Sequence, residues 1–170
     1  SIWYGSTGYI AKFDPRTQTN TRIDLSSTHA DVNRLVTGAD GSIWFVANEA
    51  SIFDNHIVGR INPVSGTLTE FALHAPNVFF NQLIRGPDGN IWLAGNNSTF
   101  GPNPFAGKVR RISPLGQITE LDLAPNSTIS MLTSGPDGNV WWFQNTPNSP
   151  NQIVRLNPTN GTTTPYPLGD

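Results

Sequence analysis

The chain of 170 residues has no cysteine, few charged residues and no long apolar run. Without cysteine, it has neither a disulfide framework nor thiolate chemistry. Charged residues make up 13% of the chain and the formal net charge is −2, so it lacks the basic patch that attracts nucleic acid or an anionic membrane. No run approaches the roughly 18 apolar residues of a membrane span. We therefore expect no nucleic-acid partner and no membrane partner.

A recurring motif, Gly-Pro/Ala-Asp-Gly followed after one residue by an aliphatic-Trp pair, divides the chain into units. Copies stand at Gly38–Trp44, Gly86–Trp92 and Gly135–Trp141, and the chain opens on the end of a fourth at Ile2–Trp3. The tryptophans are 41, 48 and 49 residues apart. No stretch has a sustained period of 3.6 residues. Self-similarity at this period predicts the blades of a β-propeller, each of four short strands.

Turn residues and alternation place the strands within each unit. Asp-Gly supplies the positive φ angles of a tight hairpin between the first and second strands. Proline followed by glycine two or three residues later predicts the turn between the third and fourth strands. The fourth strand alternates in hydrophobicity, as in Ile118–Leu123, which puts apolar side chains on one face. The sequence predicts an all-β chain of four-stranded antiparallel blades, essentially without helix, over residues 1–25, 30–73, 77–123 and 127–168.

The first unit begins at its second strand, so its innermost strand is absent. An open arc of blades would expose two apolar sheet faces, which soluble monomers rarely do. We expect either that residues ahead of Ser1 were lost by processing or that another chain completes the assembly. A homodimer forming one ring is the predicted arrangement, and a closed ring of four blades is the alternative.

Asparagine, threonine and serine are abundant, and few residues are lysine. With polar, uncharged loops and no cysteine, this composition favours an extracellular, secreted protein whose signal peptide would have been removed. The N-glycosylation motif Asn-x-Ser/Thr occurs four times, at Asn96, Asn97, Asn126 and Asn160.

The unit Gly-Pro-Asp-Gly-Asn-Ile-Trp, continued by Gly-Lys-Val-Arg-Arg-Ile-Ser-Pro-Leu-Gly-Gln-Ile-Thr-Glu-Leu, resembles the repeat of the virginiamycin B lyase, or streptogramin lyase, family of seven-bladed propellers. It is more distantly similar to NHL-type propellers. The resemblance spans nearly the whole chain. It implies the propeller fold and a magnesium-dependent elimination that linearises cyclic streptogramins, with a histidine base and acidic residues near the metal.

The catalytic positions implied by this resemblance hold other residues in this chain. The family's histidine on the first strand, which faces the central channel, corresponds to Asn33, Asn81 and Ser130. The family's glutamate, three residues after the tryptophan, corresponds to Ser6, Ala47, Gly95 and Gln144. None of these abstracts a proton or holds a divalent cation well. We therefore predict no catalytic residue, metal or cofactor in this chain, with Mg²⁺ needed only if missing or partner blades supply the histidine and glutamate.

The inserts between the second and third strands differ in length, and they share one rim with the loops that join the blades. Length variation on one rim predicts the binding face. The candidate rim residues are His29, Asp31, Glu49, Asp54, His56, His74, Phe100 and Phe105. Histidine beside carboxylate is suited to metal binding or acid–base chemistry, whereas loops are also polar without any site. The two phenylalanines either pack onto the rim or contact a ligand.

Two further sets of residues recur in every blade. Trp44, Trp92 and Trp141 are predicted to be buried between neighbouring blades. The basic residues of the third strands are predicted to donate hydrogen bonds from blade to blade; they are Lys12, Arg60, Arg111 and Arg155. Three functions remain open: a module that binds a small molecule, carbohydrate or protein through the rim, a magnesium-dependent carbon–oxygen lyase completed by other blades, and a self-assembling structural propeller. The binding module is the prediction.

Overall fold

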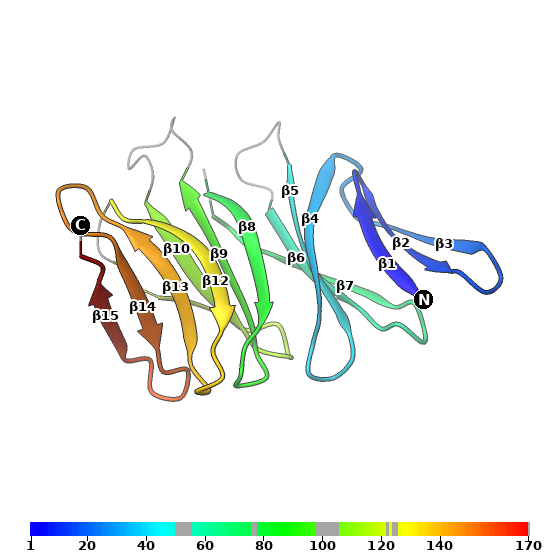
Figure 1. Ribbon diagram of the computed structural model, residues 1–170. Coiled ribbons are helices and arrows are strands. Elements are labelled where there is room, and N and C mark those ends of the chain that lie inside the picture. Colours follow the sequence, from blue (N-terminus) through cyan, green and yellow to red (C-terminus); the bar gives the residue numbers. More distant parts are fainter. Residues whose placement is uncertain (50–55, 76–77, 98–105, 122, 124–125, 170) are drawn as a thin grey trace. The chain divides into compact units, whose positions relative to one another are not determined.

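A computed structural model describes residues 1–49, 56–75, 78–97, 106–121, 123 and 126–169 (Figure 1). Within these ranges the chain contains 15 strands and no helix, and hence no helix long and apolar enough to cross a membrane. The strands form one three-stranded and three four-stranded antiparallel sheets. The predicted all-β chain of propeller blades, with the first blade lacking its innermost strand, is confirmed.

The chain divides into two compact units, Ser1–Pro76 and Asn77–Asp170. Blade 1, in the first unit, contains β1 (Ile2–Ser6), β2 (Tyr9–Asp14) and β3 (Thr19–Asp24). Blade 2, in the same unit, contains β4 (Ala30–Thr37), β5 (Ile43–Glu49), β6 (His56–Ile61) and β7 (Leu68–Ala72). Blade 3, in the second unit, contains β8 (Val78–Arg85), β9 (Ile91–Asn97), β10 (Gly107–Ile112) and β11 (Ile118–Leu121). Blade 4 contains β12 (Thr128–Ser134), β13 (Val140–Asn145), β14 (Gln152–Leu156) and β15 (Thr163–Pro167).

The repeated motif is a hairpin turn that fixes its own tryptophan. In blade 3 the Asp88 carboxylate accepts hydrogen bonds from the Asn90 backbone N–H at 3.2 Å and from the Trp92 indole N–H at 3.0 Å. Gly89 has a φ of 78°, the left-handed conformation that the turn requires. A Cβ at Gly86 would lie 2.3 Å from Cδ1 of Trp92. The indole ring therefore needs glycine at the start of the motif and aspartate within it.

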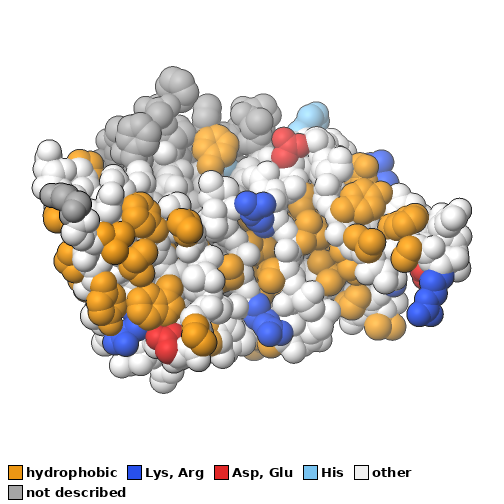
Figure 2. Space-filling model, viewed as in Figure 1, with side chains coloured by type: hydrophobic (Ala, Val, Ile, Leu, Met, Phe, Trp, Pro, Cys, Tyr) orange, Lys and Arg blue, Asp and Glu red, His pale blue; other side chains and the backbone are white. Residues whose placement is uncertain are grey.

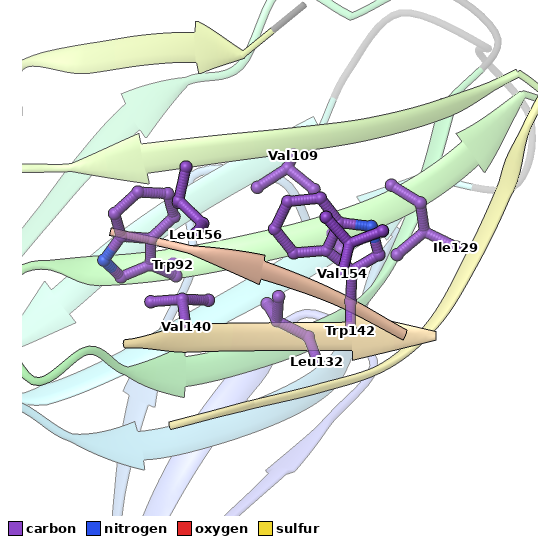
Figure 3. Packing of buried hydrophobic residues seen from close by; sticks show 9 residues of the cluster. Trp92, Val109, Ile129, Leu132, Val140, Trp142, Val154 and Leu156 are labelled. Carbon is purple, nitrogen blue, oxygen red and sulfur yellow. The ribbon is translucent and has the colours of Figure 1, made fainter. Parts of the chain in front are cut away.

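The core of the second unit lies between blades 3 and 4. Trp92 and Val109 of blade 3 pack with Val140 and Trp142 of blade 4 (Figure 3), and Ala94 belongs to the same cluster. In the first unit, Phe45 and Ile61 of blade 2 pack with Ile10 and Leu25 of blade 1 and its connection to blade 2. Each blade therefore buries one apolar face against its neighbour within the unit, which is the main stabilising contribution to such a fold.

One of the three tryptophan predictions does not hold as stated. Trp44 and Trp92 are buried as predicted, at 1% and 2% exposure, whereas Trp141 is half-buried and stacks on Tyr166 with ring centroids 5.7 Å apart. Successive strand residues point to opposite faces, so Trp142 takes the face that packs on blade 3 and Trp141 takes the other. The additional Trp142, and not Trp141, is the buried indole of β13.

Two of the repeated basic side chains link consecutive blades. Lys12 Nζ of blade 1 donates to the Pro63 carbonyl oxygen of blade 2 at 3.3 Å, and Arg111 Nη1 of blade 3 donates to the Pro158 carbonyl oxygen of blade 4 at 3.3 Å. Arg111 also lies over the Trp92 ring, 6.0 Å from its centroid. The predicted role as donors between blades is therefore observed for Lys12 in the first unit and for Arg111 in the second.

Candidate functional site

A β-bulge interrupts the innermost strand of each complete blade. In blade 2, Val32 pairs with Ala47 and Arg34 with Val46, which leaves Asn33 as the extra residue. In blade 3, Phe80 pairs with Gly95 and Gln82 with Ala94, which leaves Asn81 as the extra residue. A bulge turns side chains out of the normal alternation and is frequent beside functional sites. Asn33 and Asn81, the predicted channel residues, are both exposed at these bulges.

The bulge of blade 4 is displaced by one residue. Ser130 keeps its partner Phe143, and the irregularity falls between Ser130 and Thr133. Met131 takes a φ of 57° there and exposes 73% of its surface. A residue with an unbranched apolar side chain rarely adopts this conformation, which costs about 1–3 kcal/mol and clusters at functional positions. Met131, which the sequence reasoning did not identify, is thus the most unusual residue of this strand, while Ser130 lies in regular pairing beside it.

In the second unit the inner strands β8 and β12 lie side by side (Figure 1). The Ser134 hydroxyl donates to the Arg85 carbonyl oxygen at 2.6 Å and joins their ends. At the bulges these two strands present Asn81, Gln82, Ser130 and Met131, of which Gln82 is half-buried and the others are exposed. We call these four residues the inner surface of unit 2. It offers amide and hydroxyl groups beside one thioether and carries no charge.

The second family position, on the neighbouring strand, lies at the same level in each blade. Ala47, Gly95 and Gln144 pair directly with Val32, Phe80 and Ile129 on the inner strands. A Cβ at Gly95 would lie 2.3 Å from the Phe79 carbonyl oxygen, so this position has no room for a glutamate side chain. Ala47 is fully buried.

Gln144 is part of a buried polar network in blade 4. Its amide nitrogen donates to the Ser127 hydroxyl at 3.1 Å, and its carbonyl oxygen accepts from the Trp142 indole N–H at 3.2 Å. The Ser127 and Thr146 hydroxyls are 2.8 Å apart and share a hydrogen bond. Buried polar groups are usually paired in this way, so Gln144 has a structural role.

Three of the rim candidates lie at one end of blade 2. Asp31 is opposite Asn48 in the β4–β5 pairing, and Asn48 is opposite His56 in the β5–β6 pairing. The Leu73 N–H donates to the His56 carbonyl oxygen at 2.9 Å, which brings the following His74 to the same end. His56 is only 2% exposed, so its side chain is a buried part of the blade, whereas the prediction placed it at the surface of a loop.

The remaining rim candidates are less informative about a site. His29 is exposed in the turn before β4, close in sequence to Asp31, which was described above and also accepts a hydrogen bond from the Thr7 hydroxyl of blade 1. Glu49 ends β5. Asp54, Phe100 and Phe105 lie outside the described residues. Within the ranges that the structure describes, no three histidine, aspartate or glutamate side chains gather in a group that could hold a metal ion.

A charged cluster in blade 3 was not anticipated. The Glu120 carboxylate accepts hydrogen bonds from Lys108 and from Arg110 Nε, the latter at 2.8 Å, and the Arg110 guanidinium lies 5.3 Å from the Phe80 ring centroid. Burial raises the pKa of Glu120, but the hydrogen bonds and charges of Lys108 and Arg110 together lower this pKa by more than burial raises it. The pKa of Glu120 therefore lies below its usual value. Since each of its groups is paired, this cluster stabilises the blade.

Two clefts open between blades 3 and 4. One of about 200 Å³ is lined by Trp142, Gln144, Gln152 and Thr163 with apolar neighbours. The other, of about 250 Å³, is lined by Trp92, Arg111, Thr119 and Leu121 of blade 3 and by the turn Pro158–Gly161 of blade 4. Both are smaller than the clefts of about 300–1,000 Å³ that hold drug-sized ligands.

Sequence reasoning identified the bulged asparagines through the family resemblance but did not anticipate the bulges. The signal was present in the alternation of the inner strands. Two successive residues without core character stand between apolar ones at Asn33-Arg34 and at Asn81-Gln82. Such a pair cannot be accommodated by strict period-two pairing and indicates an inserted residue.

Comparison with known proteins places these features in context. The model of the virginiamycin B lyase family matches residues 1–170. The chain is similar to a streptogramin B lyase structure, with 22% identity, a TM-score of 0.69, and coverage of 96% of this chain and 49% of that one. It is also similar to a catalytically inactive virginiamycin B lyase from Staphylococcus aureus with quinupristin, with 24% identity, a TM-score of 0.71, and coverage of 98% and 51%.

A selenomethionine-substituted virginiamycin B lyase from Staphylococcus aureus gives 26% identity, a TM-score of 0.68, and coverage of 95% of this chain and 49% of that one. No curated protein matches the chain. The chain spans about half the length of these three structures.

Proposed function

Because this chain belongs to the virginiamycin B lyase family, we propose that it is a binding module that holds an uncharged ligand and does not itself carry out an elimination. The observation that supports this proposal is the chemistry of the bulged inner strands. Asn33, Asn81 and Ser130 stand where the family resemblance implies a histidine base. Amide and hydroxyl side chains donate and accept hydrogen bonds, but they do not take up a proton near neutral pH.

The residues at the positions implied for acidic ligands do not fit a bound magnesium ion. Mg²⁺ is held through carboxylate oxygens and waters in octahedral geometry. At the positions implied for acidic residues, Gly95 has backbone against it, Ala47 is buried and Gln144 is held in its own network. No step is therefore assigned to a metal in this chain.

The ligand class follows from the inner surface of unit 2. Asn81, Gln82 and Ser130 match the carbonyl, N–H or hydroxyl groups of a neutral ligand, and Met131 gives an apolar contact that adapts to shape. Cyclic depsipeptides and neutral oligosaccharides both carry such groups. In unit 1, the bulge at Asn33 lies two residues from Asp31 of the rim, so the rim of blade 2 is proposed as a separate binding face of that unit.

Calorimetric titration with quinupristin, and separately with a neutral oligosaccharide such as cellotetraose, tests the proposal. We expect the double variant Asn81→Ala/Gln82→Ala to weaken binding at least tenfold. Gln117→Ala, which removes an exposed amide from the blade 3 turn after β10, should bind like the unaltered chain. If neither compound binds the unaltered chain, the proposal is wrong.

A second candidate is a magnesium-dependent carbon–oxygen lyase whose histidine and glutamate come from other blades. The family match over residues 1–170 and the similarity to a virginiamycin B lyase with quinupristin favour it. Incubation of the chain with quinupristin and Mg²⁺, followed by chromatography, separates the two functions. Ring opening that a chelator abolishes would support the lyase and contradict the binding module.

We also propose that the chain is extracellular and that it self-associates as a homodimer, which leaves a structural propeller as the third possibility. The support for self-association is a face of blade 4 on which hydrophobic side chains gather over β13–β15 (Figure 2). Trp141 of β13 stacks on Tyr166 of β15, and Arg155 of β14 lies 6.0 Å from the Tyr166 ring centroid. Tyr166→Asp should lower the mass measured by light scattering to that of one chain. A single-chain mass for the unaltered protein would contradict the dimer.

A further inference from the structure

We infer that Asn160 is a site of N-linked glycosylation and that Asn96 is not, although both stand in the motif Asn-x-Ser/Thr. The motif alone does not distinguish them. Modification acts on the growing chain, but a glycan is retained in native protein only where the fold leaves room for it. In the folded chain the two amide side chains differ in their hydrogen bonds and in their exposure.

Asn96 uses its whole amide to join two blades. Its Nδ2 donates to the Ile129 carbonyl oxygen at 2.9 Å, and its Oδ1 accepts from the Ile129 N–H at 2.8 Å. The side chain is half-buried at the end of β9. A sugar on Nδ2 would replace the proton that makes the first bond and would separate β9 from β12.

Asn160 leaves its amide nitrogen available. It is exposed in the turn between β14 and β15, where its Oδ1 accepts hydrogen bonds from the Thr162 N–H at 3.0 Å and the Thr162 hydroxyl at 2.8 Å. Among the residues that the structure describes, no hydrogen bond engages Nδ2. The threonine that the motif requires is therefore already hydrogen-bonded to the side-chain oxygen of the exposed asparagine.

This arrangement is local, so it can form before the blade is complete. The Gly161 N–H donates to the Asn157 carbonyl oxygen at 2.9 Å, and Gly161 has a φ of 75°. These contacts span only residues 157–162. A growing chain can therefore present the turn to a transferase without any contact from another blade.

The surroundings of Asn160 accommodate a sugar. Asn160 is at the edge of the cleft of about 250 Å³ that is lined by Trp92, Arg111 and Thr119. The first sugar of a glycan can lie over this cleft, with its hydroxyls toward Arg111 and Thr119. The two remaining motifs are less favourable, because Asn97 is half-buried, and Thr128, which completes the motif of Asn126, is half-buried at the start of β12.

In the transfer, Nδ2 of Asn160 forms a bond to the anomeric carbon of an oligosaccharide carried on a diphospholipid. The bond from that carbon to the phosphate oxygen breaks, the lipid diphosphate leaves with the electron pair, and Nδ2 loses one proton to a base of the transferase. No oxidant or reductant is needed.

Secretion of the full chain from yeast behind a cleavable leader, followed by intact mass spectrometry before and after endoglycosidase treatment, tests the inference. We expect a glycan on the peptide that contains Asn160 and an unmodified Asn96. Asn160→Ser should remove that glycan while retaining the turn, because Ser65 occupies the same place in blade 2 and accepts the Thr67 N–H at 3.2 Å. Thr162→Ser should retain the glycan, and Thr162→Val should abolish it.

Folding is checked separately from modification. Asn160→Ser made in bacteria should unfold at the same temperature as the bacterial unaltered chain, whereas Asn96→Gln should unfold at a lower one. An unmodified Asn160 in the secreted protein, or a glycan on Asn96 of folded protein, would overturn the inference. Ligand binding by the bacterial protein is measured independently, so the binding proposal does not depend on this result.

Discussion

The turn at one end of the inner strand is the same in blades 3 and 4, whereas the residues at its bulge differ. At the turn into the next strand, blades 3 and 4 use the same aspartate–indole hydrogen bond of 3.0 Å, from Trp92 to Asp88 and from Trp141 to Asp137. At the bulges, the exposed residues change from asparagine to methionine. The turn is repeated because its glycine, aspartate and tryptophan contact one another. The exposed bulge residues vary between blades, and the binding proposal rests on this variation.

The largest effect on stability should come from the tryptophan of the repeated turn motif. Trp92→Ala removes an indole that is 2% exposed between blades 3 and 4, and it should lower the free energy of unfolding by about 3–5 kcal/mol. Trp141→Ala, at the equivalent but half-buried position, should cost clearly less. Urea denaturation of both variants measures this difference. Equal losses would contradict the burial assigned to Trp92.

A smaller loss of stability is expected when a side chain is added to the glycine that contacts the Trp92 indole. Gly86→Ala places a Cβ 2.3 Å from Cδ1 of Trp92, and such overpacking costs about 1–3 kcal/mol. Gly169→Ala is the control, because a Cβ there meets nothing within 4 Å. Thermal unfolding of the two variants should separate them, and an unchanged midpoint for Gly86→Ala would show that the turn can shift away.

The charged cluster of blade 3 gives a pH-dependent prediction. The pKa of Glu120 in the folded chain lies below its usual value of 4.5, so the stability it contributes is present above pH 4.5 and is lost as the pH falls through the lowered pKa. Glu120→Gln should be less stable than the unaltered chain at pH 7, and the gap should narrow below pH 4.5. A gap that stays constant between pH 7 and pH 3 would show that ionisation of Glu120 does not matter.

The smallest expected effect on stability is an increase, and it concerns the bulge of the inner strand β12. Met131→Asn should stabilise the chain by about 0.5–1 kcal/mol, because asparagine tolerates a positive φ better than methionine does. It should also weaken binding of quinupristin if Met131 contacts the ligand. Denaturation and titration on the same sample separate the two effects. Loss of stability in this variant would mean that the methionine contributes more by packing than its backbone costs.

The fold was predictable because its determinants are local and repeated. The Asp-Gly pairs with their tryptophans identify the hairpins wherever they occur, and alternation identifies the outer strands. Trp141 keeps the repeated position and its hydrogen bond to aspartate, and the repeat gave no sign that it would be only half-buried. Trp142 stands where the other complete blades have the buried Phe45 and Leu93, so its burial follows the repeat.

The candidate site was harder to predict from the sequence, because the position of a β-bulge depends on the register between two strands. His56 shows the same limit: its place at the end of an insert gave no sign that pairing with Asn48 would bury it.

The basic residues that join the blades form their hydrogen bonds in the same order along the chain, with the donor before the acceptor. Lys12 and Arg111 each reach forward, from an earlier blade to a proline carbonyl of the next blade in sequence. During synthesis from the N-terminus, the donor is therefore already in place when the acceptor turn emerges. Each finished blade of a unit therefore offers a hydrogen-bond donor to the blade that is made after it.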